Sequence, residues 1–141
     1  MTALRLLLFR CGEHVFAVEA GTVREIIAAS PPTRVPGAAD AVRGLINVRG
    51  TLVTVIDAAA AIGVAVAQRS AGSVILVERG ARPVGLLVDE VLDLVTLEPG
   101  ALDERAALPG VRPDLVRAVG TAGGRSFVHL ATDALLEPLL P

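Results

Sequence analysis

Aromatic side chains are nearly absent from this sequence, which contains three Phe and neither Tyr nor Trp, and its formal net charge is -2. Proteins that bind nucleic acids stack aromatic rings on bases and neutralise phosphates with clusters of Lys and Arg. This chain has neither the aromatic side chains nor the excess of positive charge. We therefore expect no nucleic-acid partner.

Cysteine and long apolar runs are also scarce. Cys11 is the single cysteine, so no disulfide can form within the chain, which is typical of a reducing compartment. An early Leu-rich run ends at Arg10, too soon for an export signal. The longest apolar stretch, Ala58 to Ala67, is about half of what a membrane-spanning helix needs. We expect a cytoplasmic protein that does not insert into membranes, so that any membrane association comes through a partner.

The residues that carry catalysis or bind metals form no recognisable group. His14 and His129 are far apart, and with Cys11 they lack the short spacings of metal ligands, so surface or satisfied histidines are expected. Asp57 and Asp89 each end an apolar segment, as turn residues commonly do. No glycine-rich phosphate-binding motif is present. We expect no enzyme activity, no cofactor and no metal.

Short segments rich in Val, Leu and Ile recur along the chain, each closed by Gly, Pro or a charged residue. This pattern of short apolar segments predicts an all-β fold of about ten strands. Pro83, which lacks a backbone donor, is expected to begin a strand or lie at a sheet edge. The clearest predicted strands are 4–10, 15–19, 44–48, 51–57, 73–78, 84–88, 89–96, 115–121 and 126–130. Short helices are expected at 38–42, 58–62 and 132–136.

About ten short strands are more than one small barrel needs, so two barrels packed together are expected within a single domain over residues 1–141. Small and polar residues near 64–72 suggest a division into 12–65 and 66–137, with an N-terminal strand able to cross between the two halves. The segment 98–113 is rich in Pro and Gly, which excludes a regular strand or a long helix there.

Residues 42–57 read VRGLINVRGTLVTVID and contain the clearest hairpin. Gly50 lets the chain reverse, which places Arg49 at the hairpin tip. The Arg49 guanidinium can project toward a partner, or it can pair with an internal carboxylate such as Glu25, and both can hold at once. Asn47 is expected to stabilise the turn through a local hydrogen bond.

The G-x-x-N-x-R-G core of this segment resembles the signature of the CheW-like family, and residues 23–27, 35–37 and 84–91 match that family in the right order. The resemblance implies two five-stranded SH3-like barrels side by side with an apolar seam. It also implies a non-catalytic adaptor that joins the regulatory domain of a CheA-type histidine kinase to the cytoplasmic tip of a chemoreceptor. The protein-interaction residues that it implies are Val23, Glu25, Ile26, Gly44, Asn47, Arg49, Gly50, Val74 and Gly85.

The sequence departs from the family's pattern at two places. Thr54 stands where a proline is usual, and Ala58-Ala59 stands where Leu-Arg is usual. These changes can alter the choice of partner. The alternative interpretation is a small SH3-like barrel that binds a peptide or another protein outside chemotaxis, because this fold hosts many functions.

Overall fold

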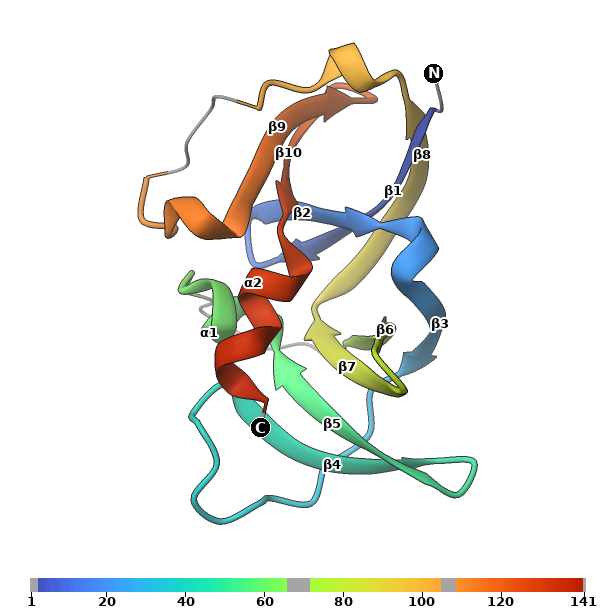
Figure 1. Cartoon of the computed structure of the whole chain (residues 1–141), viewed down its shortest axis with the longest axis vertical. Coiled ribbons are helices and arrows are strands. Elements are labelled where there is room, and N and C mark those ends of the chain that lie inside the picture. Colours follow the sequence, from blue (N-terminus) through green and yellow to red (C-terminus); the bar gives the residue numbers. More distant parts are fainter. Residues whose placement is uncertain (1–2, 66–71, 105–108, 141) are drawn as a thin grey trace.

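A computed structural model of the chain describes residues 3–65, 72–104 and 109–140. Within these ranges the chain forms ten strands in two five-stranded sheets (Figure 1). The strands are β1 (Leu4–Cys11), β2 (His14–Glu19), β3 (Val23–Ala28), β4 (Val42–Val48), β5 (Thr51–Asp57), β6 (Ser73–Arg79), β7 (Arg82–Val88), β8 (Glu90–Leu97), β9 (Val116–Ala122) and β10 (Arg125–Leu130). The helices are α1 (Ala58–Ile62) and α2 (Thr132–Leu136), and 3-10 turns cover Ala20–Thr22, Pro99–Ala101, Pro113–Leu115 and Glu137–Leu139.

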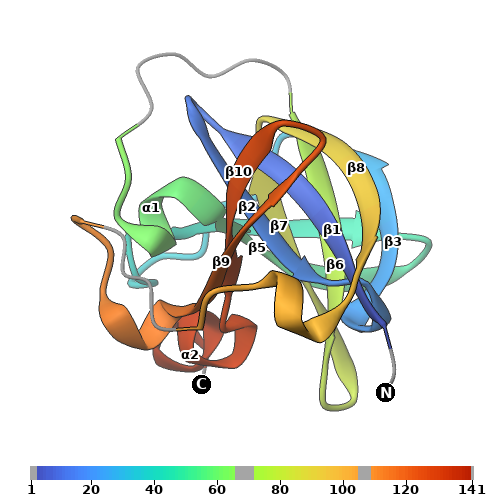
Figure 2. The same ribbon diagram turned by 90° about the horizontal axis from the view of Figure 1, so that it is seen from above.

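The two sheets share one pattern of strand pairing, which confirms the predicted pair of five-stranded β units. The first barrel has the order β8-β1-β2-β10-β9, and the second has the order β3-β6-β7-β5-β4. In each, one pair is parallel (β2 with β10, and β7 with β5) and the other pairs are antiparallel. Figure 2 looks down on the curved strands of the first barrel.

The chain crosses between the barrels twice, first through Ala20–Thr22 and again at Asp89, which alone separates β7 from β8. The Asp89 carboxylate accepts a hydrogen bond from the Gly12 N–H at 2.6 Å, and the Asp89 N–H donates to the Arg10 carbonyl at 3.0 Å. These bonds fix the second crossing against the β1–β2 turn. Asp89 is therefore a structural turn residue, as its position in the sequence indicates.

The strands do not separate at the predicted division near 64–72, part of which lies outside the described residues. β6 and β7 belong to the second barrel with β3, β4 and β5, while β1 and β2 belong to the first barrel with β8, β9 and β10. The predicted division allowed the N-terminal strand to cross between the halves, which β1 does, but it placed β2 with β3, β4 and β5, and β6 and β7 with the later strands. The β1–β8 pairing joins residues far apart in the chain, and no local pattern reports such a pairing.

Two of the three predicted helices are confirmed, at Ala58–Ile62 and Thr132–Leu136. Asp57 caps α1 because its side chain accepts a hydrogen bond from the Ala60 N–H at 3.3 Å. The predicted helix at 38–42 is wrong. That segment forms turns, with the Val42 N–H bonded to the Ala39 carbonyl at 2.9 Å, and β4 begins at Val42. The described part of 98–113 contains a 3-10 turn and a single bridge between Asp103 and Val119, as its Pro and Gly content indicates.

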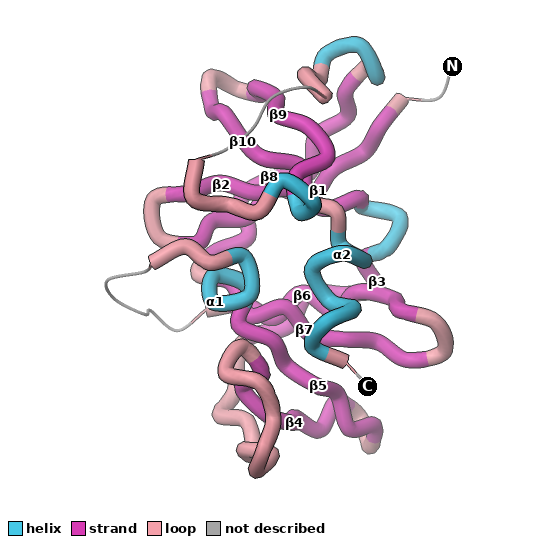
Figure 3. Tube along the Cα trace, turned by 60° about the vertical axis from the view of Figure 1, so that its left-hand side comes forward, coloured by secondary structure: helices cyan, strands magenta, loops and turns pink. Residues whose placement is uncertain are grey.

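The largest apolar cluster lies between the barrels, which confirms the predicted hydrophobic seam. It combines Phe9 and Phe16 of the first barrel with Ile56 and Leu86 of the second, all 0% exposed. Both helices contribute to the cluster and lie beside the junction (Figure 3). Smaller clusters fill each barrel separately. Because apolar burial is the main favourable term in folding, this seam holds the two barrels as one body.

No helix in the described ranges is long and apolar enough to cross a membrane.

Candidate functional site

The turn between β4 and β5 has the backbone geometry of a tight two-residue hairpin. Arg49 has φ of 49° and Gly50 has φ of 86°, so both lie in the left-handed region that a type I′ turn requires. The Asn47 side-chain oxygen accepts a hydrogen bond from the Gly50 N–H at 2.7 Å. The predicted turn and the predicted local role of Asn47 are therefore confirmed.

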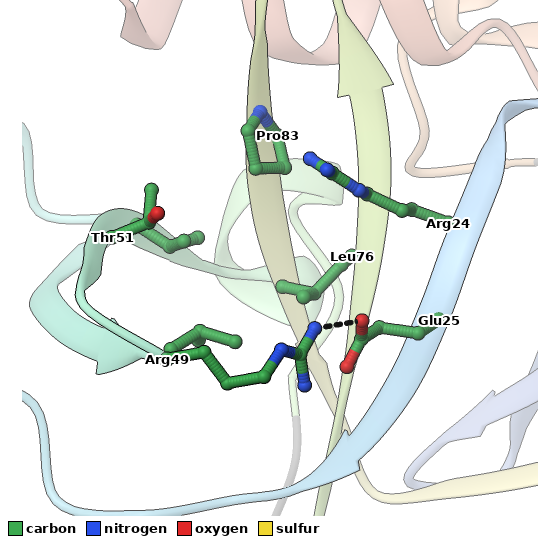
Figure 4. A pocket seen from close by; sticks show the side chains of 8 residues that line it. Arg24, Glu25, Arg49, Thr51, Leu76 and Pro83 are labelled. Carbon is green, nitrogen blue, oxygen red and sulfur yellow. Dashed lines mark hydrogen bonds and ion pairs between the residues drawn. The ribbon is translucent and has the colours of Figure 1, made fainter.

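The Arg49 guanidinium reaches across from this turn and donates a hydrogen bond to the Glu25 carboxylate on β3 (Figure 4). β3 and β4 are the opposite edges of the second sheet, so this ion pair joins the two edges across the open mouth of the barrel. The Arg49 side chain is nevertheless 69% exposed, against 28% for Glu25. The internal ion pair of Arg49 is therefore confirmed, while its contact with a partner stays a prediction that its exposure allows.

The ion pair sets the charge of the barrel mouth. The hydrogen bond from Arg49 lowers the pKa of the Glu25 carboxyl group, and the charges of Arg49 and Arg24 act in the same direction. The same hydrogen bond raises the pKa of Arg49. Both groups are therefore charged at neutral pH, and the mouth presents a fixed pair of opposite charges. Such a pair offers spare donors and acceptors to a polar surface on a partner.

The mouth itself is a small pocket of about 140 Å³. Its base is apolar, with Val53 and Leu76 almost completely buried, and its rim carries Arg24, Glu25 and Arg49. The Arg24 Nε atom lies 3.6 Å from a carboxylate oxygen of Glu78. An apolar base inside a charged rim is an arrangement that suits contact with a protein surface.

The structure brings together some of the predicted interaction residues at this surface and separates others from it. Ile26 follows Glu25 on β3 and is 44% exposed, while Val23 is half-buried at the start of the strand. Asn47 and Gly50 are exposed at the hairpin tip. These residues, with Glu25 and Arg49, form what we call the β3–hairpin surface.

Val74, Gly85 and Gly44 are buried, so a direct contact of these three residues with a partner disagrees with the structure. Val74 is 1% exposed, and a Cβ atom added at Gly85 would lie 2.6 Å from its Cγ1 atom. Gly44 has φ of 139°, and the Thr33 carbonyl lies where a Cβ atom at Gly44 would be. These residues shape the interior of the second barrel and the path of β4. The sequence pattern marked them correctly as special, but it could not distinguish an interior position from an exposed one.

Sequence reasoning did not assign Arg24, Leu76 and Pro83 to this site, although all three line the pocket. Pro83 was expected at an edge, and the structure pairs it with Glu78 of β6 but not with β5. Only a weak indication in the sequence assigns Arg24 to the site, namely its position next to Glu25 on a strand with alternating exposure. The sequence contains no such indication for Leu76, since an aliphatic residue in a strand is ordinarily part of a core.

The described residues contain no cluster of three or more metal-binding side chains. His14 is exposed, as expected for a surface histidine. His129 differs from the expectation, because it is buried and its Nε2 atom has no hydrogen-bond partner among the described residues. The Glu19 carboxylate lies 4.0 Å from that atom. Burial lowers the pKa of His129, the charge of Glu19 opposes this effect, and Arg117 reinforces it.

Two five-stranded barrels that share one apolar core, with an ion-paired hairpin at an open mouth, define a double-barrel β protein of the SH3-like class. The fold matches the crystal structure of the scaffolding protein TtCheW from Thermoanaerobacter tengcongensis, with a TM-score of 0.87 over 97% of this chain and 94% of that chain, at 20% identity. The chain belongs to the CheW-like family, since the model of the CheW-like domain matches residues 5–139.

Relatives in other bacteria support this assignment. The chemotaxis protein CheW of Rhizobium meliloti (strain 1021) is 40% identical over 93 residues, which cover 65% of this chain and 60% of that protein. A probable chemotaxis protein CheW of Rhizobium etli is 41% identical over the same shares. The chemotaxis protein CheW of Thermotoga maritima is 27% identical over 134 residues, or 95% of this chain and 88% of that protein. The match therefore spans about 60% of the length of the two Rhizobium relatives.

Proposed function

We propose that this chain is a non-catalytic coupling protein that works in the cytoplasm. It joins the regulatory domain of a CheA-type histidine kinase to the cytoplasmic tip of a chemoreceptor in a bacterial chemosensory pathway. The family assignment and the names of its relatives, which are chemotaxis proteins or a scaffolding protein, support this role. They also favour it over a peptide-binding barrel outside chemotaxis.

The observation that carries the proposal is the exposed position of Arg49 on a rigid support. A long charged side chain at a hairpin tip normally samples many rotamers, and ordering it on binding costs free energy. Here the bond to Glu25 and the type I′ turn hold the guanidinium in place before any partner arrives. A preorganised group of this kind loses less entropy on binding than a free one does.

The β3–hairpin surface supplies the rest of the contact. Ile26 offers an exposed aliphatic side chain next to the ion pair, and Val23 extends the surface toward the first barrel. Gly50 and Asn47 keep the turn narrow, so a partner can approach the hairpin closely. The buried Gly44, Val74 and Gly85 contribute indirectly, through the packing of the barrel that carries this surface.

The proposal is tested by titrating the chain with the kinase regulatory domain and, separately, with a receptor cytoplasmic fragment, using isothermal calorimetry. We expect a stoichiometric complex that Arg49→Glu weakens about tenfold or more without unfolding the protein. Arg125→Glu is the matched control, because Arg125 is an exposed residue at the β9–β10 hairpin of the other barrel. Absence of binding to both partners would contradict the proposed function.

A charge-swapped variant separates the two roles of Arg49. Glu25→Arg with Arg49→Glu restores an ion pair across the barrel mouth but presents the wrong charge at the hairpin tip. If Arg49 contacts the partner, affinity stays low in this double variant while the thermal midpoint recovers. If affinity recovers together with the thermal midpoint, Arg49 acts only inside the chain, and its role as a contact residue is rejected.

A further inference from the structure

The pairing of β5 with β7 stops before the β4–β5 hairpin ends. Thr54 to Asp57 of β5 pair with Val84 to Leu87 of β7, whereas Thr51, Leu52 and Val53 pair only with β4. Across the gap lies Pro83, which has no backbone N–H to offer. In the described parts of the chain, no strand covers this three-residue edge of β5. Figure 4 shows Thr51 and Pro83 apart from each other at the pocket that Leu76 also lines.

Successive residues of β5 face two different hollows, because side chains alternate along a strand. Thr51 and Val53 line the pocket at the Arg49–Glu25 ion pair, whereas Leu52 and Thr54 line a separate open groove of about 570 Å³. The two hollows meet at Pro83, which lines both. The groove therefore lies on the other face of β5 from the β3–hairpin surface.

The groove is apolar in its centre. Leu45, Val84 and Leu140 line it together with Leu52, which at 66% is the most exposed of the large hydrophobic side chains described. An aliphatic side chain exposed to water gains nothing from burial in the folded chain, whereas covering it with a partner's apolar group favours binding. Leu52 is thus available as an anchor for an apolar group from outside.

The charge at the rim of the groove has one sign. Arg79 and Arg82 line it, and no acidic residue does. Arg79 is held by Asp133 at 3.2 Å, but Arg82 forms no ion pair with any described residue. An arginine in this position binds carboxylates through charge-assisted, bidentate hydrogen bonds. The occupant that complements this rim is acidic.

We propose that this groove binds an extended, acidic segment of a partner protein, which adds as a strand to the free edge of β5 at Thr51–Val53. The backbone of the segment supplies hydrogen bonds to that edge. An aliphatic side chain packs on Leu52, and flanking Asp or Glu residues contact Arg82 and Arg79. This mode of binding combines main-chain affinity with pockets for alternate side chains. It is separate from the proposed contact at the β3–hairpin surface, so each surface can fail its test independently.

The test is selection of a phage-displayed library of random short peptides on the immobilised chain, with the Leu52→Thr/Arg82→Glu double variant as counter-selection. We expect enriched peptides with an aliphatic residue between Asp or Glu residues. A synthetic copy of an enriched peptide should lose about tenfold or more in affinity for either single variant. Arg125→Glu should bind it as wild type does. No enrichment, enrichment of basic peptides, or equal binding to the double variant would overturn the proposal.

A second measurement addresses how the peptide binds. Amide chemical shifts of ¹⁵N-labelled protein should change at Thr51–Val53 and Arg82, and N-methylation of alternate peptide bonds should abolish binding. Undiminished binding of the N-methylated peptide, or helix formation on binding, would reject strand addition. Sedimentation velocity over a range of concentrations gives the remaining check. A dimer that Leu52→Thr abolishes would assign the groove to a second copy of this chain and overturn the proposal.

Discussion

Arg49 occupies a left-handed backbone conformation that arginine adopts rarely, and it does so at the tip of the β4–β5 hairpin. The left-handed geometry of the turn costs free energy for most residues with a Cβ atom; Gly would remove that cost, and Asn would reduce it. The ion pair with Glu25 links two edges of the sheet that have no backbone pairing with each other. An unfavourable conformation at an exposed charged residue is consistent with the contact role proposed for Arg49.

The buried His129 makes stability depend on pH. Burial lowers the pKa of His129 below the value of about 6.5 that it has in the unfolded chain. Between the pKa of the folded state and that of the unfolded state, the unfolded state therefore binds more protons. The contribution of neutral His129 to stability is complete above the unfolded-state pKa, and it is lost as the pH falls toward the folded-state pKa. The charged groups facing the ring are Glu19, which opposes the shift, and Arg117, which adds to it.

We predict that the urea midpoint is lower at about pH 5.5 than at about pH 7.5, a window that avoids most carboxylate titration. His129→Gln, which cannot take up a proton, should reduce this difference. The exposed His14 supplies the control, since His14→Gln should leave the difference as it is in wild type. A wild-type midpoint that is equal at both pH values would contradict the prediction, as would a His129→Gln variant that keeps the full difference.

At the scale of elements, β6 and β7 pair regularly, and Gly85 of β7 is a position without a side chain in that pair. Val74 on β6 occupies the space where a Cβ atom of Gly85 would be, and Leu76 and Val55 surround the same point. Gly85 therefore leaves room for Val74 inside the second barrel, which is the barrel that carries Arg49 and Glu25. The effect of Gly85 on the candidate site is therefore one of packing.

We predict that Gly85→Ala lowers the free energy of unfolding by about 1–3 kcal/mol through overpacking. Val74→Ala alone also destabilises, because it leaves a cavity. In the double variant the new methyl group partly fills that cavity, so the loss should be smaller than the sum of the two single losses by about 0.5–3 kcal/mol. Urea unfolding of the four proteins measures this coupling. Additive losses would show that the two side chains do not compete for the same space.

Strands and turns were predictable from sequence because their signals are local. The Arg49–Gly50 turn, the Asn47 bond and the Asp57 cap each depend on residues within a few positions of one another. The β1–β8 pairing and the burial of Val74 depend on segments far apart in the chain, so no local pattern could supply them. The Glu25–Arg49 pair lies between these cases. The opposite charges of the two residues make an ion pair possible, but whether the side chains meet depends on how β3 and the β4–β5 turn are placed in space.

At the scale of the whole molecule, the seam between the barrels is a larger apolar core than the interior of either barrel. The chain also enters and leaves the second barrel through short connections, Ala20–Thr22 and Asp89. A partner that binds the β3–hairpin surface therefore contacts a barrel that cannot move independently of the other. This rigidity suits the proposed coupling role, because a partner bound to one barrel is held in a fixed position relative to the other barrel.

We predict that the two barrels unfold as one cooperative unit, so that a small defect in one lowers the stability of both. Ile56→Val removes one methyl group from a fully buried position in the second barrel and should cost about 0.5–1.5 kcal/mol. Hydrogen exchange should show the same loss of protection in slowly exchanging amides of β1 and β2 in the first barrel. Ile26→Val makes the same change at an exposed position of the second barrel and should leave both barrels unaffected. If Ile56→Val lowers protection in β5 and β7 while β1 and β2 keep theirs, the seam does not couple the barrels, and a contact on the second barrel could not be relayed rigidly to the first.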